Sequence, residues 1–272
     1  MRSLLLASLA LLCCFSLPVE AADGKYPTYL SAEEAGVDFQ IQGEYEGTAG
    51  ETKMGAQVVA LGEGEFDVYV LGGGLPGAGW SGKDKLQLSG KSTDGKVWLN
   101  GAIAEGWIEG ETMSLSLLDG DKFTLNKVVR QSPTLGAKPP EFATILFDGS
   151  GLEAWNGGTI VDGLLATLGE NGAPRTKQEF KNFSLHLEFR TPFMPTARGQ
   201  ARGNSGMYLL DQYECQVLDS FGLPGYDNEC GGVYKVSSPS VNMCFPPLSW
   251  QTYDVEFQAA EFDDEGKKVK TR

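Results

Sequence analysis

Between Phe39 and Arg130 the chain consists of short runs of strand-forming residues separated by glycine-containing turns. Seven such runs follow one another at spacings of roughly 8–14 residues, and no helical period appears between them. The runs are FQIQGEY, AQVVAL, FDVYVL, KLQLSG, KVWLNG, ETMSLSLL and KFTLNKVV. Short strands joined by tight turns bury their apolar faces by closing or stacking a sheet, so we expect a small all-β barrel or sandwich over residues 22–130.

A proline-rich segment separates these runs from the rest of the chain. Residues 131–141 read QSPTLGAKPPE, and their three prolines stiffen the segment as a linker. We therefore expect a second domain over residues 142–272. With 272 residues and 41% hydrophobic content, the chain is long and apolar enough for two folded domains.

The second domain contains a long alternating run, Phe183–Arg190, with the sequence FSLHLEFR. Phenylalanine and leucine occupy every second position, which predicts a strand with one apolar face. The other face then carries His186, Glu188 and Arg190. These side chains can form part of a site, but Glu188 and Arg190 can equally form a surface ion pair, and His186 can be an ordinary surface residue.

Residues 204–220, NSGMYLLDQYECQVLDS, predict a β-hairpin. Its strands, Met207–Leu210 and Tyr213–Leu218, are joined by a two-residue polar turn. Side chains alternate along a strand, so Glu214 and Gln216 point to the face opposite their apolar neighbours. A carboxylate and a carboxamide on one face predict either a binding surface or a solvated outer face.

Five motifs of the second domain, spaced over about residues 141–262, follow one another in a recognisable order. They are LFDGSGLEAW, LHLEFR, NSGMYL, YECQVLDS and SWQTYDVEF. This pattern resembles the 3-keto-disaccharide hydrolase domain family, which implies a concanavalin-A-like jelly-roll sandwich and an all-β chain. Many members carry an arginine where this chain has Leu210. The family's closing strands do not appear before Arg272, so we expect the domain to be incomplete at its C-terminus.

The resemblance implies an enzyme acting on 3-keto-glycosides that a separate glycoside 3-oxidoreductase supplies. The C3 ketone acidifies the C2 proton, so a carboxylate can remove it, after which the C1 aglycone leaves and water adds back. The candidate catalytic carboxylates are Glu214, Glu188 and Asp219, with Glu214 as the base because a strand holds it rigidly. A two-carboxylate glycosidase route stays open, as does an Asx-turn role for Asp219.

Polar and aromatic side chains near these carboxylates are candidates for binding the sugar. They are Arg190, His186, Asn204, Tyr208, Gln216 and Trp250, of which Trp250 is equally suited to core packing. The chain has one histidine and no paired cysteine–histidine spacing, so no cofactor is predicted and a divalent metal is left open. The alternative functions are a non-catalytic carbohydrate-binding module of the same fold and a purely structural surface protein.

The N-terminus, MRSLLLASLALLCCFSLPVEAA, predicts export. One arginine precedes the apolar run Leu4–Leu17, and Val19–Ala21 form a small-residue cleavage pattern, so residues 1–21 are a predicted signal peptide. The run is shorter than the ~20 residues that a membrane span needs. We expect a secreted or periplasmic protein, with a membrane anchor or a lipoprotein anchor at Cys13 or Cys14 as the alternatives.

The net charge of the chain limits the classes of molecule that it can bind, and its cysteines predict one disulfide. A formal net charge of −14 repels nucleic acid and anionic lipid heads but leaves a neutral carbohydrate unaffected, so we expect a carbohydrate substrate and no nucleic-acid partner. In an oxidising compartment Cys230 and Cys244 are predicted to form a disulfide around a glycine- and proline-rich loop. Cys215 then remains as a buried thiol.

Overall fold

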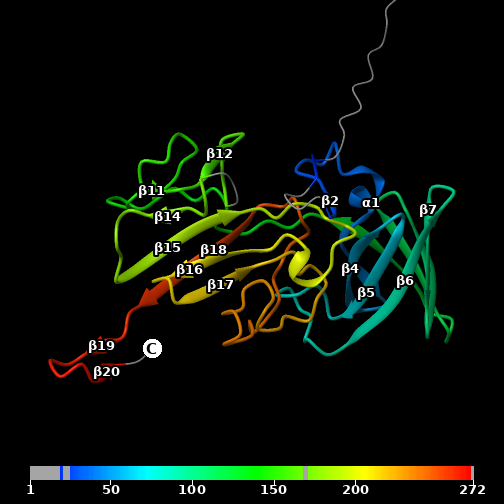
Figure 1. Cartoon of the computed structure of the whole chain (residues 1–272). Coiled ribbons are helices and arrows are strands. Elements are labelled where there is room, and N and C mark those ends of the chain that lie inside the picture. Colours follow the sequence, from blue (N-terminus) through cyan, green and yellow to red (C-terminus); the bar gives the residue numbers. More distant parts are fainter. Residues whose placement is uncertain (1–18, 21–24, 168–170, 271–272) are drawn as a thin grey trace, which may run out of the picture.

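The computed structural model describes residues 19–20, 25–167 and 171–270, which form an all-β protein (Figure 1). Within these residues the helical elements are one short helix, α1 (Gly36–Ile41), and one 3-10 turn, η1 (Gly199–Ala201). The predicted all-β class is therefore confirmed. The predicted signal peptide lies outside the described residues except for β1 (Val19–Glu20), which pairs with β2 (Pro27–Thr28).

Eight antiparallel strands of the first half close into a barrel. They are β3 (Gly43–Ala49), β4 (Thr52–Gly62), β5 (Glu65–Gly72), β6 (Lys85–Thr93), β7 (Lys96–Gly101), β8 (Ala104–Glu109), β9 (Thr112–Leu117) and β10 (Lys122–Val128). Each strand pairs with its neighbours in sequence, and β10 returns to pair with β3. Closure pairs every strand on both sides, which leaves the barrel without a free edge.

The main hydrophobic core fills this barrel. Alternate residues of each strand point inward, as the alternation of the runs predicts. The buried members include Tyr45, Val58, Phe66, Val68, Leu88, Val97, Ile108, Met113 and Leu125. Phe193, from the second half of the chain, joins the same core, and its ring packs edge-on against Phe39 of α1 at a centroid distance of 5.4 Å. The barrel core is thus completed by a side chain from outside the barrel.

Among the eight barrel strands, β8 is the one that the sequence pattern does not predict. Its sequence, AEGWIE, places two glutamates and a tryptophan outward, and only Ala104, Gly106 and Ile108 point inward. The inward face is therefore small and carries little apolar signal. Gly106 is required there because a Cβ would lie 2.1 Å from the Ser114 carbonyl oxygen on β9.

The start of the barrel also differs from expectation. The helix α1 begins at Gly36, ahead of the first predicted strand. The predicted strand FQIQGEY is divided between α1 and β3. Gly43, with φ of +143°, makes the break, since few other residues adopt that backbone conformation.

The second half of the chain forms short antiparallel strand pairs (Figure 1). The pairs are β11 (Trp155–Asn156) with β14 (Arg175–Thr176), β12 (Thr159–Val161) with β13 (Leu164–Ala166), β15 (Asn182–Phe189) with β18 (Gln251–Gln258), β16 (Ser205–Leu209) with β17 (Tyr213–Val217), and β19 (Glu261–Phe262) with β20 (Lys268–Lys270). The predicted alternating strand is confirmed as β15 and the predicted hairpin as β16–β17, but β16 ends at Leu209, so Leu210 belongs to the turn and not to the strand as predicted.

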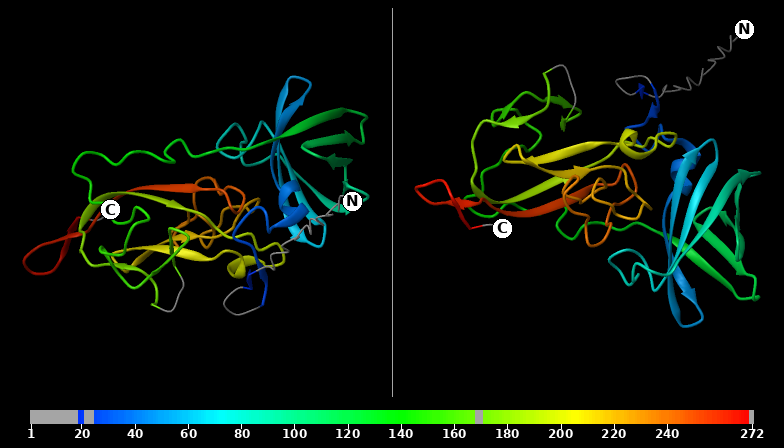
Figure 2. Two further views of the ribbon diagram at one scale, coloured as in Figure 1. Left: turned by 90° about the horizontal axis from the view of Figure 1, so that it is seen from above. Right: turned by 60° about the horizontal axis from the view of Figure 1, so that its bottom comes forward.

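Two of these pairs, β15–β18 and β16–β17, lie face to face as two layers (Figures 1 and 2). The Tyr213 ring of β17 approaches the Phe257 ring of β18 at a centroid distance of 6.3 Å. The Tyr253 hydroxyl crosses the same interface and donates a 2.5 Å hydrogen bond to the Gln216 carbonyl oxygen. Residues that alternate with these, on both layers, therefore lie on the outer faces.

The linker and the loops after β15 attach the two layers to the barrel. The linker runs from β10 along the outer face of β15–β18, as Figure 2 shows. Arg198 and Arg202 donate hydrogen bonds of 3.0 and 3.2 Å to the Leu61 and Ala60 carbonyl oxygens of β4. Lys85 of β6 donates to the Gly222 carbonyl oxygen at 3.1 Å. Independent folding of residues 22–130 stays a prediction.

Candidate active site

The hairpin β16–β17 carries its polar side chains on its outer face. Its turn places Leu210 and Asp211 in the left-handed region, with φ of +52° and +54°, and the Gln212 amide donates to the Leu209 carbonyl oxygen at 3.1 Å. Turns of this hand match the twist of the flanking strands and fix their register. The register pairs Tyr208 directly with Glu214.

Tyr208 and Glu214 interact across the hairpin. The Tyr208 hydroxyl donates a 2.9 Å hydrogen bond to Glu214 Oε2, and this bond to a carboxylate raises the pKa of Tyr208 above its ordinary value. The Glu214 side chain lies over Gly206, where a Cβ would come within 2.1 Å of Glu214 Oε1. The glycine of the NSG motif thus makes room for the carboxylate. Tyr208 is 60% exposed, so the pair can be reached from solvent.

Gln216 shares this strand face but is covered. It is 1% exposed, and its amide nitrogen donates to Gln200 Oε1 at 2.9 Å, beside the 3-10 turn. Gln216 Oε1 is buried and accepts no hydrogen bond from the described residues. The predicted substrate-binding side chain is therefore buried, where it holds Gln200 by this hydrogen bond.

Asp219, the second candidate carboxylate of the YECQVLDS motif, is buried in an ion pair. It is 2% exposed, Arg202 is 5% exposed, and Arg202 Nε donates to Asp219 Oδ2 at 2.6 Å. Burial raises the pKa of the Asp219 carboxyl, and the guanidinium opposes that rise. Asp219 Oδ1 accepts from the Phe221 amide at 3.4 Å, the Asx-type contact left open by the sequence. Asp219 holds the loop that follows β17.

Glu188, the third candidate, lies on the other layer. The structure does not bring it together with Glu214, because Glu188 alternates with the inward residues of β15 and Glu214 with the inward residues of β17. The two carboxylates therefore point away from one another, from opposite surfaces of the two-layer unit. Glu188 Oε1 accepts a 2.5 Å hydrogen bond from the Gly136 amide of the linker.

His186 belongs to the same outer face of β15–β18. Its Nδ1 lies 2.7 Å from Asp254 Oδ1, and its Nε2 lies 3.3 Å from Glu188 Oε1. Asp254, and to a lesser degree Glu188, raise the pKa of His186. Asp254 also accepts a 2.6 Å hydrogen bond from the Thr134 hydroxyl of the linker, which together with His186 lowers its pKa. This cluster pins the linker to the sheet.

Of the remaining candidates for binding the sugar, Arg190 and Trp250 lie together and Asn204 lies on the hairpin. Arg190 Nη2 donates to the Leu30 carbonyl oxygen at 3.1 Å, and its guanidinium lies 5.5 Å from the centre of the Trp250 ring. Arg190 and Trp250 are thus together, beside the segment that precedes the barrel. Asn204 is exposed at the start of β16, on the hairpin.

A guanidinium lies at the hairpin turn, next to Leu210. Arg175 of β14 forms an ion pair with Asp211, the residue after Leu210. The sequence pattern gave no reason to select Arg175, because it lies 36 residues from its partner. Contacts of this separation depend on the tertiary fold.

Cys230 and Cys244 are buried free thiols in this structure, and their side chains contact one another. The contact lowers the pKa of Cys230 and raises that of Cys244. Cys230 Sγ also lies 3.2 Å from the Tyr253 hydroxyl. Both cysteines line a hollow of about 310 Å³ between the linker and the segment before β18. Their predicted disulfide stays a prediction.

Neither a metal site nor a membrane-spanning helix is found in the part of the chain that the structure describes. Among residues 19–20, 25–167 and 171–270, no group of three or more histidine, cysteine, aspartate or glutamate side chains is arranged to hold a metal ion. The same residues contain no helix with the length and apolarity needed to cross a bilayer.

Comparisons with known proteins concern the second half of the chain. Residues 143–265 match the sequence pattern of the 3-keto-alpha-glucoside-1,2-lyase-like domain. A crystal structure of a candidate glycosyl hydrolase from Parabacteroides distasonis ATCC 8503 is 36% identical in sequence, over 48% of this chain and 58% of that one, with a TM-score of 0.44. The chain thus matches less than two thirds of that protein's length. No curated protein matches the chain.

Proposed function

We propose, from the premise that residues 143–265 belong to the 3-keto-alpha-glucoside-1,2-lyase-like domain family, that this protein cleaves 3-keto-glycosides. The proposed reaction is an elimination at C1 and C2 of the oxidised sugar, followed by addition of water. The observation that supports Glu214 as the base is its open position on the hairpin face, hydrogen-bonded to Tyr208. Of the three predicted carboxylates, Asp219 is buried in an ion pair and Glu188 is held by the linker.

The chemistry follows from the ketone. A carbonyl at C3 acidifies the C2–H bond, and Glu214 takes that proton, leaving an enolate across C2 and C3. The electron pair then forms the C1–C2 double bond as the C1–O bond breaks, and the aglycone leaves with a proton. Addition of water across the double bond of the resulting enone returns a free 3-keto-sugar and balances the overall hydrolysis.

Tyr208 acts on this reaction through Glu214. Its hydrogen bond fixes Oε2 of the carboxylate, and the other oxygen, Oε1, lies against Gly206. Holding a base in one orientation reduces the reorganisation needed when the substrate arrives. Tyr208 is therefore a positioning residue.

The charge of the protein agrees with a neutral substrate. A net charge of −14 does not repel an uncharged keto-sugar, whereas it disfavours a sugar phosphate. The substrate must come from an oxidation at C3 of a glycoside, so the proposal requires a glycoside 3-oxidoreductase to act beforehand. Export by the predicted signal peptide is part of the same proposal, and N-terminal sequencing of the secreted protein should give a start near Ala22.

The proposal is tested by incubating the full-length protein with glucosides and with their 3-keto derivatives, with and without a chelator. We expect aglycone release from the 3-keto-glucosides alone. Retention of activity in chelator would assign proton abstraction to the side chains, and its loss would add a metal to the mechanism. Saturable binding of glycosides without release of aglycone from any of them would instead identify a carbohydrate-binding module.

A further inference from the structure

The outer wall of the barrel carries a row of side chains that crosses five strands. In register, Glu65 of β5 pairs with Lys91 of β6, Lys91 with Trp98 of β7, Trp98 with Trp107 of β8, and Trp107 with Ser114 of β9. Adjacent strands are about 4.8 Å apart, so the row is about 19 Å long. Two indole rings thus lie in the middle of a row that has polar groups at both ends.

The two indole rings are exposed. Trp98 is 53% and Trp107 39% accessible, and their centroids are 6.3 Å apart with the planes inclined at 51°. Large apolar side chains are normally withdrawn from water, and tryptophan is enriched at surfaces that bind other molecules. A cross-strand aromatic pair also stabilises a sheet, but that role does not require both rings to remain open to solvent.

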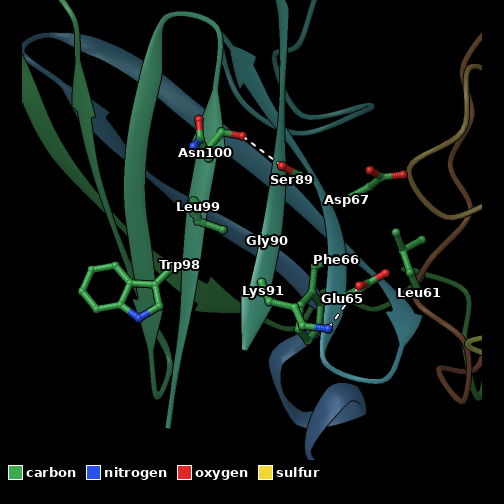
Figure 3. Close-up of a pocket in the computed structure, with 10 residues that line it drawn as sticks. All are labelled: Leu61, Glu65, Phe66, Asp67, Ser89, Gly90, Lys91, Trp98, Leu99 and Asn100. Carbon is green, nitrogen blue, oxygen red and sulfur yellow. Dashed lines mark hydrogen bonds and ion pairs between the residues drawn. The ribbon is translucent and has the colours of Figure 1, made fainter. Parts of the chain in front are cut away.

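A second, parallel row of polar side chains borders the indoles. It runs through Asp67, Ser89, Asn100 and Glu105, one from each of β5 to β8. A hollow of about 750 Å³ lies against this part of the wall and is lined by Trp98, Asn100, Ser89, Lys91, Glu65 and Asp67, among others (Figure 3). Lys91 and Glu65 form a 3.1 Å ion pair at the hollow, so their two opposite charges cancel there.

We propose that this wall, the row Glu65–Lys91–Trp98–Trp107 with Asn100 and Ser89 beside it, binds a neutral polysaccharide chain. An aromatic face suits the apolar C–H face of a sugar ring, while amide, hydroxyl and carboxylate groups bind its hydroxyls. The row is longer than one sugar ring, so an extended chain fits it better than a monosaccharide. The charge of −14 disfavours acidic polysaccharides.

This binding function is separate from the proposed cleavage reaction. The wall belongs to β5–β9 of the barrel, and Glu214 lies on β17 of the second half of the chain. A polysaccharide bound to the wall would hold the enzyme on the material that yields its glycosides. Either function can fail without the other.

The test is affinity electrophoresis of the full chain in native gels that contain laminarin, galactomannan, hydroxyethyl cellulose or glycogen, with alginate as the acidic control. We expect retardation in at least one neutral gel and none in alginate. Trp98→Ala and Trp107→Ala should each weaken binding about tenfold or more, the scale of a central aromatic contact. Tyr226→Ala, which removes an aromatic side chain that is 60% exposed outside the barrel, should bind as the wild type does.

The wild-type chain provides a readout that does not depend on folding of the variants. Hydroxyl-radical footprinting should show Trp98 and Trp107 protected by the polysaccharide that retards the chain. No retardation in any neutral gel, or binding that leaves both tryptophans unprotected, would overturn the proposal. Concentration-dependent self-association that is lost in Trp98→Ala, without glycan binding, would reassign the wall to contact with a second copy.

Discussion

The Tyr208 hydroxyl donates a 2.9 Å hydrogen bond to Glu214 across the β16–β17 hairpin, and the bond raises the pKa of Tyr208. In Glu214→Gln the ionised acceptor is gone, so we expect the pKa of Tyr208 to fall toward its ordinary value. Titration by NMR with ring-labelled tyrosine measures this directly. Tyr208→Phe should lower turnover roughly tenfold, the scale of one hydrogen bond to a charged group.

A matched control is available on the same hairpin. Tyr213 lies on the opposite face, against Phe257, and makes no contact with Glu214 among the hydrogen bonds of the described residues. Tyr213→Phe should leave both turnover and the Tyr208 titration unchanged. An unchanged Tyr208 titration in Glu214→Gln would mean that the two groups do not interact in solution.

The buried Arg202–Asp219 pair should matter for stability far more than the exposed Arg175–Asp211 pair. Removing one member of a buried pair leaves an uncompensated charge, so Asp219→Ala should lower the free energy of unfolding by about 3–5 kcal/mol. Asp211→Ala breaks a pair whose members are 70% and 56% exposed and should cost at most about 1 kcal/mol. Urea unfolding of both variants compares them. Equal losses would contradict the burial of Arg202 and Asp219.

The His186–Asp254 contact predicts a pH dependence of stability. The raised pKa of His186 means that its contribution is fully present below its ordinary value of 6.5 and is lost as pH rises through the raised pKa. The lowered pKa of Asp254 means that its contribution is present above 3.8 and is lost as pH falls through the lowered pKa. The contributions of His186 and Asp254 to stability are therefore both present between pH 3.8 and pH 6.5.

The measurement is the melting temperature as a function of pH for the wild type and His186→Gln. The difference between the two proteins should be largest between pH 3.8 and 6.5 and should shrink as the pH rises through the raised pKa of His186. A difference that stays constant across this range would show that His186 stabilises the fold by packing alone. Ser184→Gln, on the same face of β15, is the control for a glutamine at such a position.

Cys230 and Cys244 are predicted to form a disulfide in secreted protein. Their thiols are buried together and interact with one another. Peptide mapping without reduction should recover residues 230 and 244 as one linked peptide, with Cys215 free. Two separately alkylated cysteines in the secreted protein would refute the bond.

The sequence predicts strands better than it predicts which sheets face one another. The alternation in Phe183–Arg190 and the turn after Leu209 fix β15 and the hairpin, because both signals are local. Alternation also correctly places Glu188 and Leu187 on opposite faces of β15, and Glu214 and Tyr213 on opposite faces of β17. It contains no information on the orientation of the layers, which depends on contacts such as Tyr213–Phe257, 44 residues apart. For that reason the sequence alone could not show that Glu188 and Glu214 lie on opposite surfaces of the two layers.

Burial is equally hard to derive from the motif alone. Gln216 and Glu214 share a face of β17, but only Gln216 is covered, because Gln200 and residue 228 come from loops elsewhere in the chain. Asp219 is buried in an ion pair with Arg202, which lies 17 residues earlier in the chain, directly after the 3-10 turn η1. β8 was not predicted because its inward face is built from alanine, glycine and one isoleucine.

The central claim is that Glu214 removes the C2 proton of a 3-keto-glycoside, and Glu214→Gln tests it most directly. The amide keeps the size of the side chain and can still bond to Tyr208, but it cannot act as the base. Exchange of the C2 proton with solvent deuterium, followed by NMR on a 3-keto-glucoside, should be rapid with the wild type. In Glu214→Gln it should fall by about 10²–10⁴-fold with substrate affinity little changed. Exchange at the wild-type rate in Glu214→Gln would contradict the account.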